Sequence, residues 1–170
     1  MKPPRTPRRR FMLSAPVRHR PVAADPAARA PTSGDADALG ALLLEAYRGT
    51  VDDDGETLVE ACRLARALFA GLSGVPMWAV SEVTEREGRL VSATIVTLWQ
   101  DTPLVAQLVT APDWQRRGLA RAGLQRAMNR MAAGDEAVVR LVVTQGNAPA
   151  EALYESLGFR PEARPPFSSA

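Results

Sequence analysis

The stretch DWQRRGLARAGLQ, residues 113–125, is the most informative part of the sequence for the fold. Its second half has the apolar spacing of a helix. Three arginines, Arg116, Arg117 and Arg121, occupy the start of that helix, where aligned peptide dipoles already leave partial positive charge. This stack of positive charge predicts that a strongly negative group binds the helix end from outside.

A phosphate site is one interpretation of this helix start. A helix that follows a tight turn offers unpaired backbone N–H groups as well as its dipole. Gly118 has no Cβ atom and lets a bulky anion approach the backbone, and Ala120 keeps the next position small. Guanidinium groups suit phosphate oxygens. A solvated basic helix face fits the stretch equally well, so these residues alone leave both interpretations open.

The helix lies between two strand-like runs, LVAQLVT at residues 104–110 and AVVRLVVT at residues 137–144. Such a crossover makes the two strands parallel neighbours or near neighbours in one sheet. The whole pattern predicts the order β-α-α-β-β-β-α-β-α-β, an α/β fold of the α+β kind with a mixed sheet covered by helices. The other expected elements are strands at 28–32, 77–83 and 89–99, helices beginning near 32, 57 and 147, and at most one short strand from 159.

Charge is distributed unevenly along the chain. Seven of the 21 basic residues and no acidic residue fall in the first 20 positions, which leaves 14 basic against 19 acidic residues in the rest. We therefore expect residues 1–26 to be a basic, disordered extension and residues 27–170 to form a single domain. A basic arm can also contact nucleic acid, but a solvated extension is the preferred interpretation.

The sequence favours a cytoplasmic protein. RRRFMLSA, residues 8–15, resembles a twin-arginine export signal, but proline and arginine follow it in place of an apolar stretch. No apolar run approaches the length needed to span a bilayer. The single cysteine, Cys62, excludes an internal disulfide framework and fits a reducing compartment.

Common cofactor and catalytic motifs are absent from the sequence. It contains neither a P-loop nor the glycine pattern of dinucleotide-binding folds, and it has no G-x-S-x-G elbow. The only histidine, His19, lies in the basic extension, and no metal-ligand spacing occurs. We therefore expect no metal.

Two motifs resemble the signatures of the GNAT superfamily of acyl-CoA-dependent N-acetyltransferases. QRRGLA, residues 115–120, matches the pattern Q/R-x-x-G-x-G/A, and NAPAEALYESLGF, residues 147–159, matches N-x-x-A-x-x-L-Y-x-x-x-G-F at every fixed position. The motifs stand in the superfamily's order with one strand between them, and the resemblance covers residues 29 to 160. It implies a GNAT-type fold and transfer of an acetyl group from acetyl-CoA to an amine.

The resemblance also implies a site for acetyl-CoA. Its pantetheine arm would pair with the backbone of Leu108, Val109 and Thr110, like an added strand, and would receive a hydrogen bond from Asn147. Tyr154 would face the sulfur and protonate the departing thiolate. The pyrophosphate would lie on the turn and the first helical residues, which are Gln115, Arg116, Arg117, Gly118, Leu119, Ala120 and Arg121.

The general base is not apparent from the resemblance. Many members of the superfamily carry a glutamate at the position that is Gln107 here, and an amide cannot act as a base. Glu82 is one alternative that could face the cleft. The others are the acids of the loop between the first two helices, which would lie over the acceptor amine, and proton removal through water is a further possibility. These loop acids are Asp52, Asp53, Asp54 and Glu56.

The preferred interpretation is an N-acetyltransferase that uses acetyl-CoA and acts on an amine of a small molecule, a peptide or a protein. Gln107 keeps a second interpretation open, a module that binds acyl-CoA without turnover. A third is a nucleic-acid-associated protein that uses the basic arm.

The chain after Phe159 is shorter than the superfamily pattern. Only eleven residues follow, three of them prolines, so a full terminal hairpin does not fit. The sheet would then end in an exposed edge, which proteins commonly cover or pair. We expect a homodimer at or near this edge and an open acceptor site.

Overall fold

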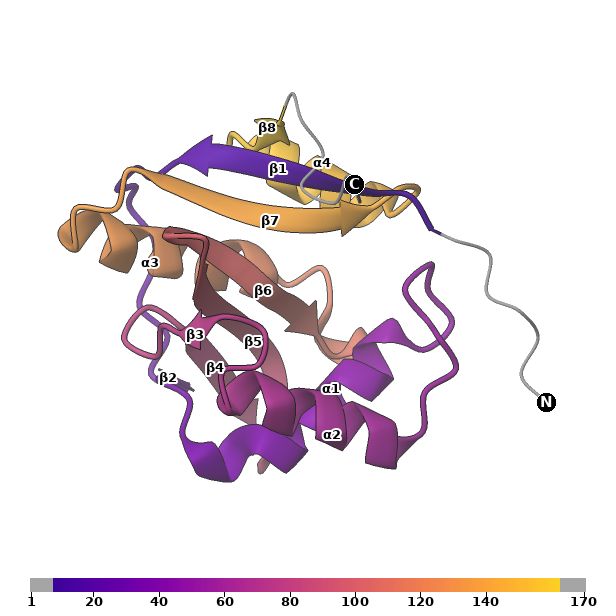
Figure 1. Cartoon of the computed structure of the whole chain (residues 1–170). Coiled ribbons are helices and arrows are strands. Elements are labelled where there is room, and N and C mark those ends of the chain that lie inside the picture. The colour runs from indigo at the N-terminus through magenta and orange to yellow at the C-terminus, as the bar shows by residue number, and fades with distance from the viewer. Residues whose placement is uncertain (1–7, 163–170) are drawn as a thin grey trace.

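The computed structural model describes residues 8–162, which form one mixed sheet with helices on both faces (Figure 1). The strand order is β2-β4-β5-β6-β7-β1-β8, and β3 pairs with β5 off this path. The strands are β1 Arg10–Pro16, β2 Ala28–Arg29, β3 Val75–Pro76, β4 Glu82–Arg86, β5 Arg89–Trp99, β6 Thr102–Thr110, β7 Val138–Thr144 and β8 Arg160–Pro161. The helices are α1 Ala36–Tyr47, α2 Leu58–Phe69, α3 Leu119–Ala133 and α4 Ala148–Ser156, with short 3-10 turns at Ser33–Asp35 and Pro112–Trp114.

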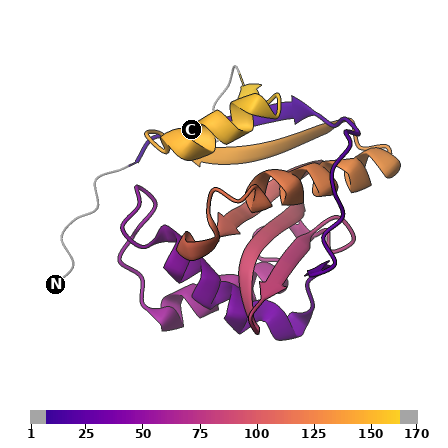
Figure 2. The ribbon, with the colours of Figure 1, turned by 180° about the vertical axis from the view of Figure 1, so that it is seen from behind.

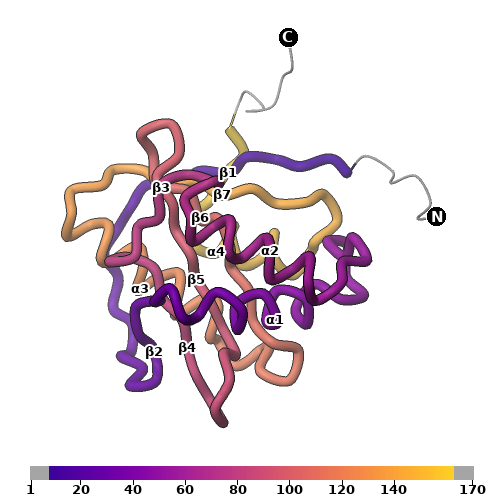
Figure 3. The backbone as a smooth tube through the Cα atoms, turned by 60° about the horizontal axis from the view of Figure 1, so that its bottom comes forward, coloured from indigo at the N-terminus to yellow at the C-terminus, as the bar shows by residue number. Residues whose placement is uncertain are grey.

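Two hydrophobic cores hold the helices to the sheet. On one face α1 and α2 lie side by side (Figure 3), and Leu39, Leu43 and Leu68 pack against β4 and β5. The other face carries α3 and α4 (Figure 2), where Leu124 and Met128 are almost fully buried. The expected α/β fold and the helix positions are therefore confirmed. β1 and β3 are additional to the expected order, and the strand expected at 77–83 begins only at Glu82, because residues 78–80 form a turn. No helix within residues 8–162 is long and apolar enough to cross a membrane.

The expectation of a disordered extension is wrong for its described part. β1 pairs antiparallel with β7 over its whole length, from Arg10 opposite Thr144 to Pro16 opposite Val138. Met12 and Ala15 are buried in this strand, so apolar burial and strand pairing fix a segment whose flanking arginines suggested a solvated tail.

The residues that follow β1 are also fixed, because they run along α3. The side-chain amide of Asn129 donates to the Arg20 carbonyl at 2.8 Å and its oxygen accepts from the Arg20 N–H at 2.9 Å. The Gln125 amide donates to the Arg18 carbonyl at 3.2 Å. A domain boundary at residue 26 is therefore wrong, whereas residues 1–7 of the expected extension lie outside the described residues.

The sheet edge that the sequence predicts to be exposed is paired with β1. This strand covers the edge of β7, and β8 in turn pairs with β1 at Leu13 and Ser14. The edge that suggested a homodimer is thus occupied by the chain's own N-terminal strand, while the short strand expected after Phe159 is present as the two residues of β8. A homodimer stays a prediction that has lost this support.

β6 and β7 diverge, and this opens the centre of the molecule. Their parallel pairing consists of Leu104 opposite Arg140 and Val105 opposite Leu141. Directly afterwards the register between β5 and β6 shifts, because Ile95 pairs with Gln107 while Val96 pairs with Val105. Ala106 is therefore the extra residue of a β-bulge, which bends β6. The rest of β6, through Thr110, runs on without a partner in β7.

Candidate active site

The start of α3 has the geometry of an anion site. Gly118 precedes the helix with a φ of 82°, and a Cβ built on it would meet nothing within 4 Å. The N–H of Ala122 donates to the Gly118 carbonyl at 2.9 Å. The N–H groups of Leu119, Ala120 and Arg121 precede this first helical bond, so they have no acceptor within the helix. Open space in front of free N–H groups fits a phosphate.

The arginines of the opening stretch lie around this helix start in different ways. Arg117 stacks on the Trp114 ring, 4.6 Å from the centroid, and donates to the Asp113 carbonyl at 2.9 Å. Arg121 donates to the Ser156 hydroxyl at 2.6 Å, which ties α3 to α4. Arg116 has a φ of 59° and lines the adjoining pocket. Arg116 and Arg121 thus line the adjoining pocket, whereas Arg117 does not.

The anion pocket, as we call this cavity of about 590 Å³, lies where β6 and β7 separate. It brings together every residue predicted to bind the coenzyme except Arg117. Its lining residues are Ala46, Tyr47, Thr50, Leu108, Val109, Thr110, Trp114, Gln115, Arg116, Gly118, Leu119, Ala120, Arg121, Asn147, Pro149, Ala150, Leu153 and Tyr154.

Tyr154 lines the anion pocket from α4. Its side chain is mostly buried, and its ring lies 5.9 Å from that of Phe159. Burial and, to a smaller extent, the charge of Asp52 raise the pKa of the Tyr154 hydroxyl to about 12. The phenol therefore stays protonated at neutral pH and has a proton to donate.

The carboxylate of Asp52 is fixed by hydrogen bonds beside the anion pocket. Its carboxylate accepts hydrogen bonds from the Thr144 hydroxyl at 2.6 Å and from the Asn147 amide at 3.0 Å. Asn147 also caps α4, because its side-chain oxygen accepts from the Ala150 N–H at 3.3 Å. These hydrogen bonds join the loop between α1 and α2 to the loop between β7 and α4.

The other three loop acids have local partners. Asp53 accepts from the N–H groups of Gly49 and Gly55 at 2.7 and 2.8 Å, and these backbone hydrogen bonds lower its pKa. Asp54 pairs with Arg8 at 2.9 Å. Glu56 accepts from the Asp54 N–H at 3.2 Å. The predicted acidic surface over the acceptor is therefore largely neutralised, and the carboxylate of Asp52 contacts Asn147, a residue of the anion pocket.

Glu82 does not face the cleft, which corrects the prediction for this residue. It is 2% exposed and points toward α3, where Arg126 Nε and Arg130 Nη2 each donate to its carboxylate at 2.9 Å. Two guanidinium groups compensate the buried charge. Glu82 holds β4 to α3 and lines neither pocket described here.

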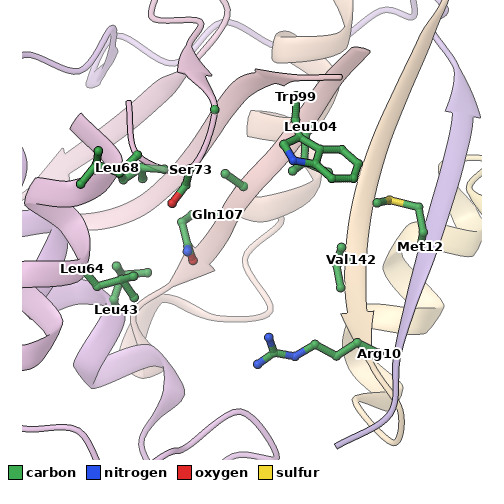
Figure 4. A pocket seen from close by; sticks show the side chains of 13 residues that line it. Arg10, Met12, Leu43, Leu64, Leu68, Ser73, Trp99, Leu104, Gln107 and Val142 are labelled. Carbon is green, nitrogen blue, oxygen red and sulfur yellow. The ribbon is translucent and has the colours of Figure 1, made fainter. Parts of the chain in front are cut away.

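A second cavity, the apolar pocket, has a volume of about 450 Å³ and lies on the α1 and α2 side of the divergence (Figure 4). Gln107 points into it, and the Tyr47 hydroxyl of the anion pocket donates to the Gln107 side-chain oxygen at 2.7 Å. The two cavities therefore meet at this pair. The apolar pocket is lined by Arg10, Met12, Leu43, Leu64, Leu68, Leu72, Ser73, Gly74, Trp99, Leu104, Ala106, Gln107 and Val142.

Arg10 and Met12 line the apolar pocket although the sequence predicts no site role for them, because both fall in the expected disordered extension. The alternation of the segment FMLSA, residues 11–15, between the two sheet faces is the signal that could have found them. Met12 faces the apolar pocket, whereas Phe11 and Leu13 line a separate pocket beside α4.

This geometry combines a phosphate cradle, an open strand edge, a protonated phenol and an adjoining apolar cavity. A phosphate-bearing thioester could lie along β6 with its sulfur near Tyr154, and a second substrate could approach from the apolar pocket. Such an arrangement suits the transfer of an acyl group between two bound substrates.

Comparisons with known proteins agree with this geometry. The ribosomal protein bS18-alanine N-acetyltransferase of Escherichia coli is 35% identical over 74 residues, which are 44% of this chain and 50% of that protein. The chain thus matches about half the length of this curated relative.

Two solved structures share the fold. One is a ribosomal-protein-alanine N-acetyltransferase from Brucella melitensis, with a TM-score of 0.62 and 24% identity over 78% of this chain and 83% of that one. The other is the PaiA N-acetyltransferase of Thermoplasma acidophilum in complex with coenzyme A, with a TM-score of 0.65 and 15% identity over 82% of this chain and 92% of that one.

A family model described as "Acetyltransferase (GNAT) family" matches residues 38–159, which include α3, α4 and every residue of the anion pocket. With the divergence of β6 from β7, this match completes the assignment: the chain belongs to the GNAT family of acetyltransferases, and it is an acyltransferase.

Proposed function

We propose that this protein transfers the acetyl group of acetyl-CoA to a primary amine by direct attack of the amine. The observation that carries the proposal is the set of groups that two neighbouring cavities bring together. The N–H groups at the start of α3, the open edge of β6 at Leu108 and the phenol of Tyr154 follow one another in the anion pocket, which then meets the apolar pocket at Gln107.

The residues of the anion pocket suit the charge and the extended shape of the donor. The helix start with Gly118 and the side chains of Arg116 and Arg121 bind the phosphates. The backbone of β6 at Leu108 and the N–H of Thr110, which have no partner in β7, hold the extended arm as an added strand would be held. When bound, acetyl-CoA supplies an activated thioester carbonyl.

Proton transfer requires a donor for the leaving thiolate and an acceptor for the amine. Tyr154, which the raised pKa keeps protonated, donates to the sulfur. Gln107 cannot accept a proton, and Glu82 is bound by two arginines. The carboxylate of Asp52 accepts a hydrogen bond from Asn147 of the anion pocket, and we assign to this carboxylate the role of accepting the proton of the attacking amine, directly or through water.

The acceptor in this proposal is a small amine or the amino terminus of a peptide. The name of the Escherichia coli relative specifies an alanine of a ribosomal protein, which supports an α-amino group as the nucleophile. The structure gives less support to nucleic-acid binding by the basic arm, because Arg8 pairs with Asp54 and Arg10 lines the apolar pocket.

A module that binds acyl-CoA without turnover is the second candidate, and the amide at Gln107 favours it. A thiol-release assay separates the two candidates. Wild-type protein is incubated with acetyl-CoA and a panel of amino acids, polyamines and short peptides, and acetyl-CoA binding is measured by calorimetry in parallel. Turnover with any amine supports the enzyme, whereas tight binding without thiol release on the whole panel supports the binding module.

A further inference from the structure

We propose that the amine acceptor is a free apolar α-amino acid and that Arg10 binds its carboxylate. This inference rests on the proposed function and specifies the substrate class of the same site. Three features of the apolar pocket carry it: its single charged residue, its walls, and its junction with the anion pocket.

Arg10 is the only charged residue among those that line the apolar pocket. Figure 4 shows its side chain reaching from β1 toward the side of the pocket on which Leu43 and Gln107 lie. Within residues 8–162, no side chain or carbonyl forms a hydrogen bond or ion pair with its guanidinium. Arg10 is exposed, so water solvates its guanidinium in the ligand-free protein. At the edge of an apolar cavity a planar anion can replace this water through two hydrogen bonds, as a carboxylate allows.

The neighbouring arginines differ from Arg10 in the groups that their side chains contact. Arg8 donates to the Asp53 carbonyl at 2.6 Å and pairs with Asp54. Arg9 lies over the Phe11 ring, 6.0 Å from the centroid, and Phe11 lines the pocket beside α4. Arg10 thus presents its charge to the apolar pocket, whereas Arg9 presents the same charge to the other face of the sheet.

The walls of the apolar pocket specify the side chain of the acceptor. Leu64 and Leu72 line the pocket with exposed fractions of 48% and 78%, so a ligand that covers them buries apolar surface. Met12, Leu104 and Val142 form further apolar wall. A volume of about 450 Å³ accommodates a side chain of the size of leucine, methionine or phenylalanine.

The junction of the two pockets places the amine. β6 supplies Leu104 and Gln107 to the apolar pocket and Leu108 to the anion pocket. An acceptor whose carboxylate contacts Arg10 and whose side chain contacts the leucines therefore has its α-amino group toward Gln107, next to the thioester carbonyl. The amino terminus of a peptide offers the same amine but replaces the carboxylate with an amide, which leaves the charge of Arg10 uncompensated.

The test compares leucine with leucinamide, which differ only in the carboxylate. The amine of leucinamide has the lower pKa and is the better nucleophile at neutral pH, so a preference for leucine must come from the protein. We expect kcat/KM for leucine to exceed that for leucinamide at least about tenfold, the scale of a charge-assisted pair of hydrogen bonds. Arg10→Gln should remove this preference through KM, and the matched control Arg9→Gln should retain it.

Two further measurements separate this inference from the proposed function. Calorimetry of leucine added to the protein with coenzyme A should show binding to wild type and to Arg9→Gln but not to Arg10→Gln, whether or not turnover occurs. Acetyl-CoA affinity and the melting temperature should be the same in all three proteins. The inference is overturned if leucinamide or a peptide is acetylated as well as leucine, or if Arg10→Gln keeps the wild-type preference. Either of these results would leave the acetyltransferase assignment intact.

Discussion

The hydroxyl of Tyr47 donates to the side-chain oxygen of Gln107 at 2.7 Å, and this hydrogen bond lies at the boundary between the anion pocket and the apolar pocket. Burial raises the pKa of Tyr47 well above its usual range, so the phenol remains a donor and fixes the orientation of the Gln107 amide. A glutamine fixed in this way can orient a substrate but cannot take a proton. The proposed mechanism therefore assigns proton acceptance to Asp52.

The first prediction concerns the helix start. Gly118→Val should weaken acetyl-CoA binding about 100-fold or more, because its Cβ would occupy the open space that the phosphates need. Valine at a φ of 82° is also strained. Gly88→Val is the matched control, since Gly88 has a φ of 73° and open space in the hairpin between β4 and β5. Calorimetry that shows equal affinity for the two variants would contradict the phosphate site.

Tyr154→Phe tests the proton donor. The phenylalanine keeps the buried ring beside Phe159 and removes only the hydroxyl. We expect kcat to fall about 100-fold at nearly unchanged acetyl-CoA affinity, the usual scale for one positioned acid. An unchanged kcat would exclude Tyr154 from the chemistry.

Asp52→Asn tests the proton acceptor. Asparagine preserves the shape of the side chain and its hydrogen bond with Thr144 but removes the charge. We expect kcat/KM to fall about 100-fold, because an amide cannot accept the proton of the amine. Asp53→Asn, on the same loop but engaged with Gly49 and Gly55, should stay within a few-fold of wild type. Equal effects of the two substitutions would indicate a purely structural role for Asp52.

The N-terminal strand should be essential to the sheet. Removing residues 1–16 exposes the β7 backbone edge from Val138 to Thr144 and takes away the buried Met12 and Ala15. We expect a lower melting temperature and self-association, measured by calorimetry and light scattering. A truncated protein that stays monomeric and as stable as the full chain would show that β1 does not contribute to the fold.

Acid should destabilise the protein through Asp35. Its carboxylate pairs with Arg29 at 2.8 Å, and the hydrogen bonds from Arg29 lower its pKa from 3.8 to about 2. Because the folded pKa is the lower one, the stabilisation is present above pH 3.8 and is lost as the pH falls through about 2. Urea unfolding across this range should show a smaller loss of stability for Asp35→Asn than for wild type. Identical pH slopes would contradict the assignment.

The parts of the site that the sequence predicted correctly are marked by local patterns of residues. The arginine-rich helix start and the segment from Asn147 to Phe159 each lie within a few turns of chain, and the structure brings them to one pocket as expected. Arg10 was missed because its strand pairs with β7, more than 120 residues away, and no local pattern reports such pairing. Glu82 was misplaced because the face that a strand residue points to depends on register, which the sequence does not specify.

The most direct test of the account is rapid mixing of the protein with an equimolar amount of acetyl-CoA, with and without an amine acceptor. Direct attack predicts no thiol release in the absence of the amine and one thiol per acetylated amine in its presence, with both signals much slower in Tyr154→Phe. A stoichiometric burst of thiol without any amine would contradict direct attack, because it would show transfer of the acetyl group to the protein itself. Bound acetyl-CoA that is never consumed with any amine would contradict the enzyme altogether.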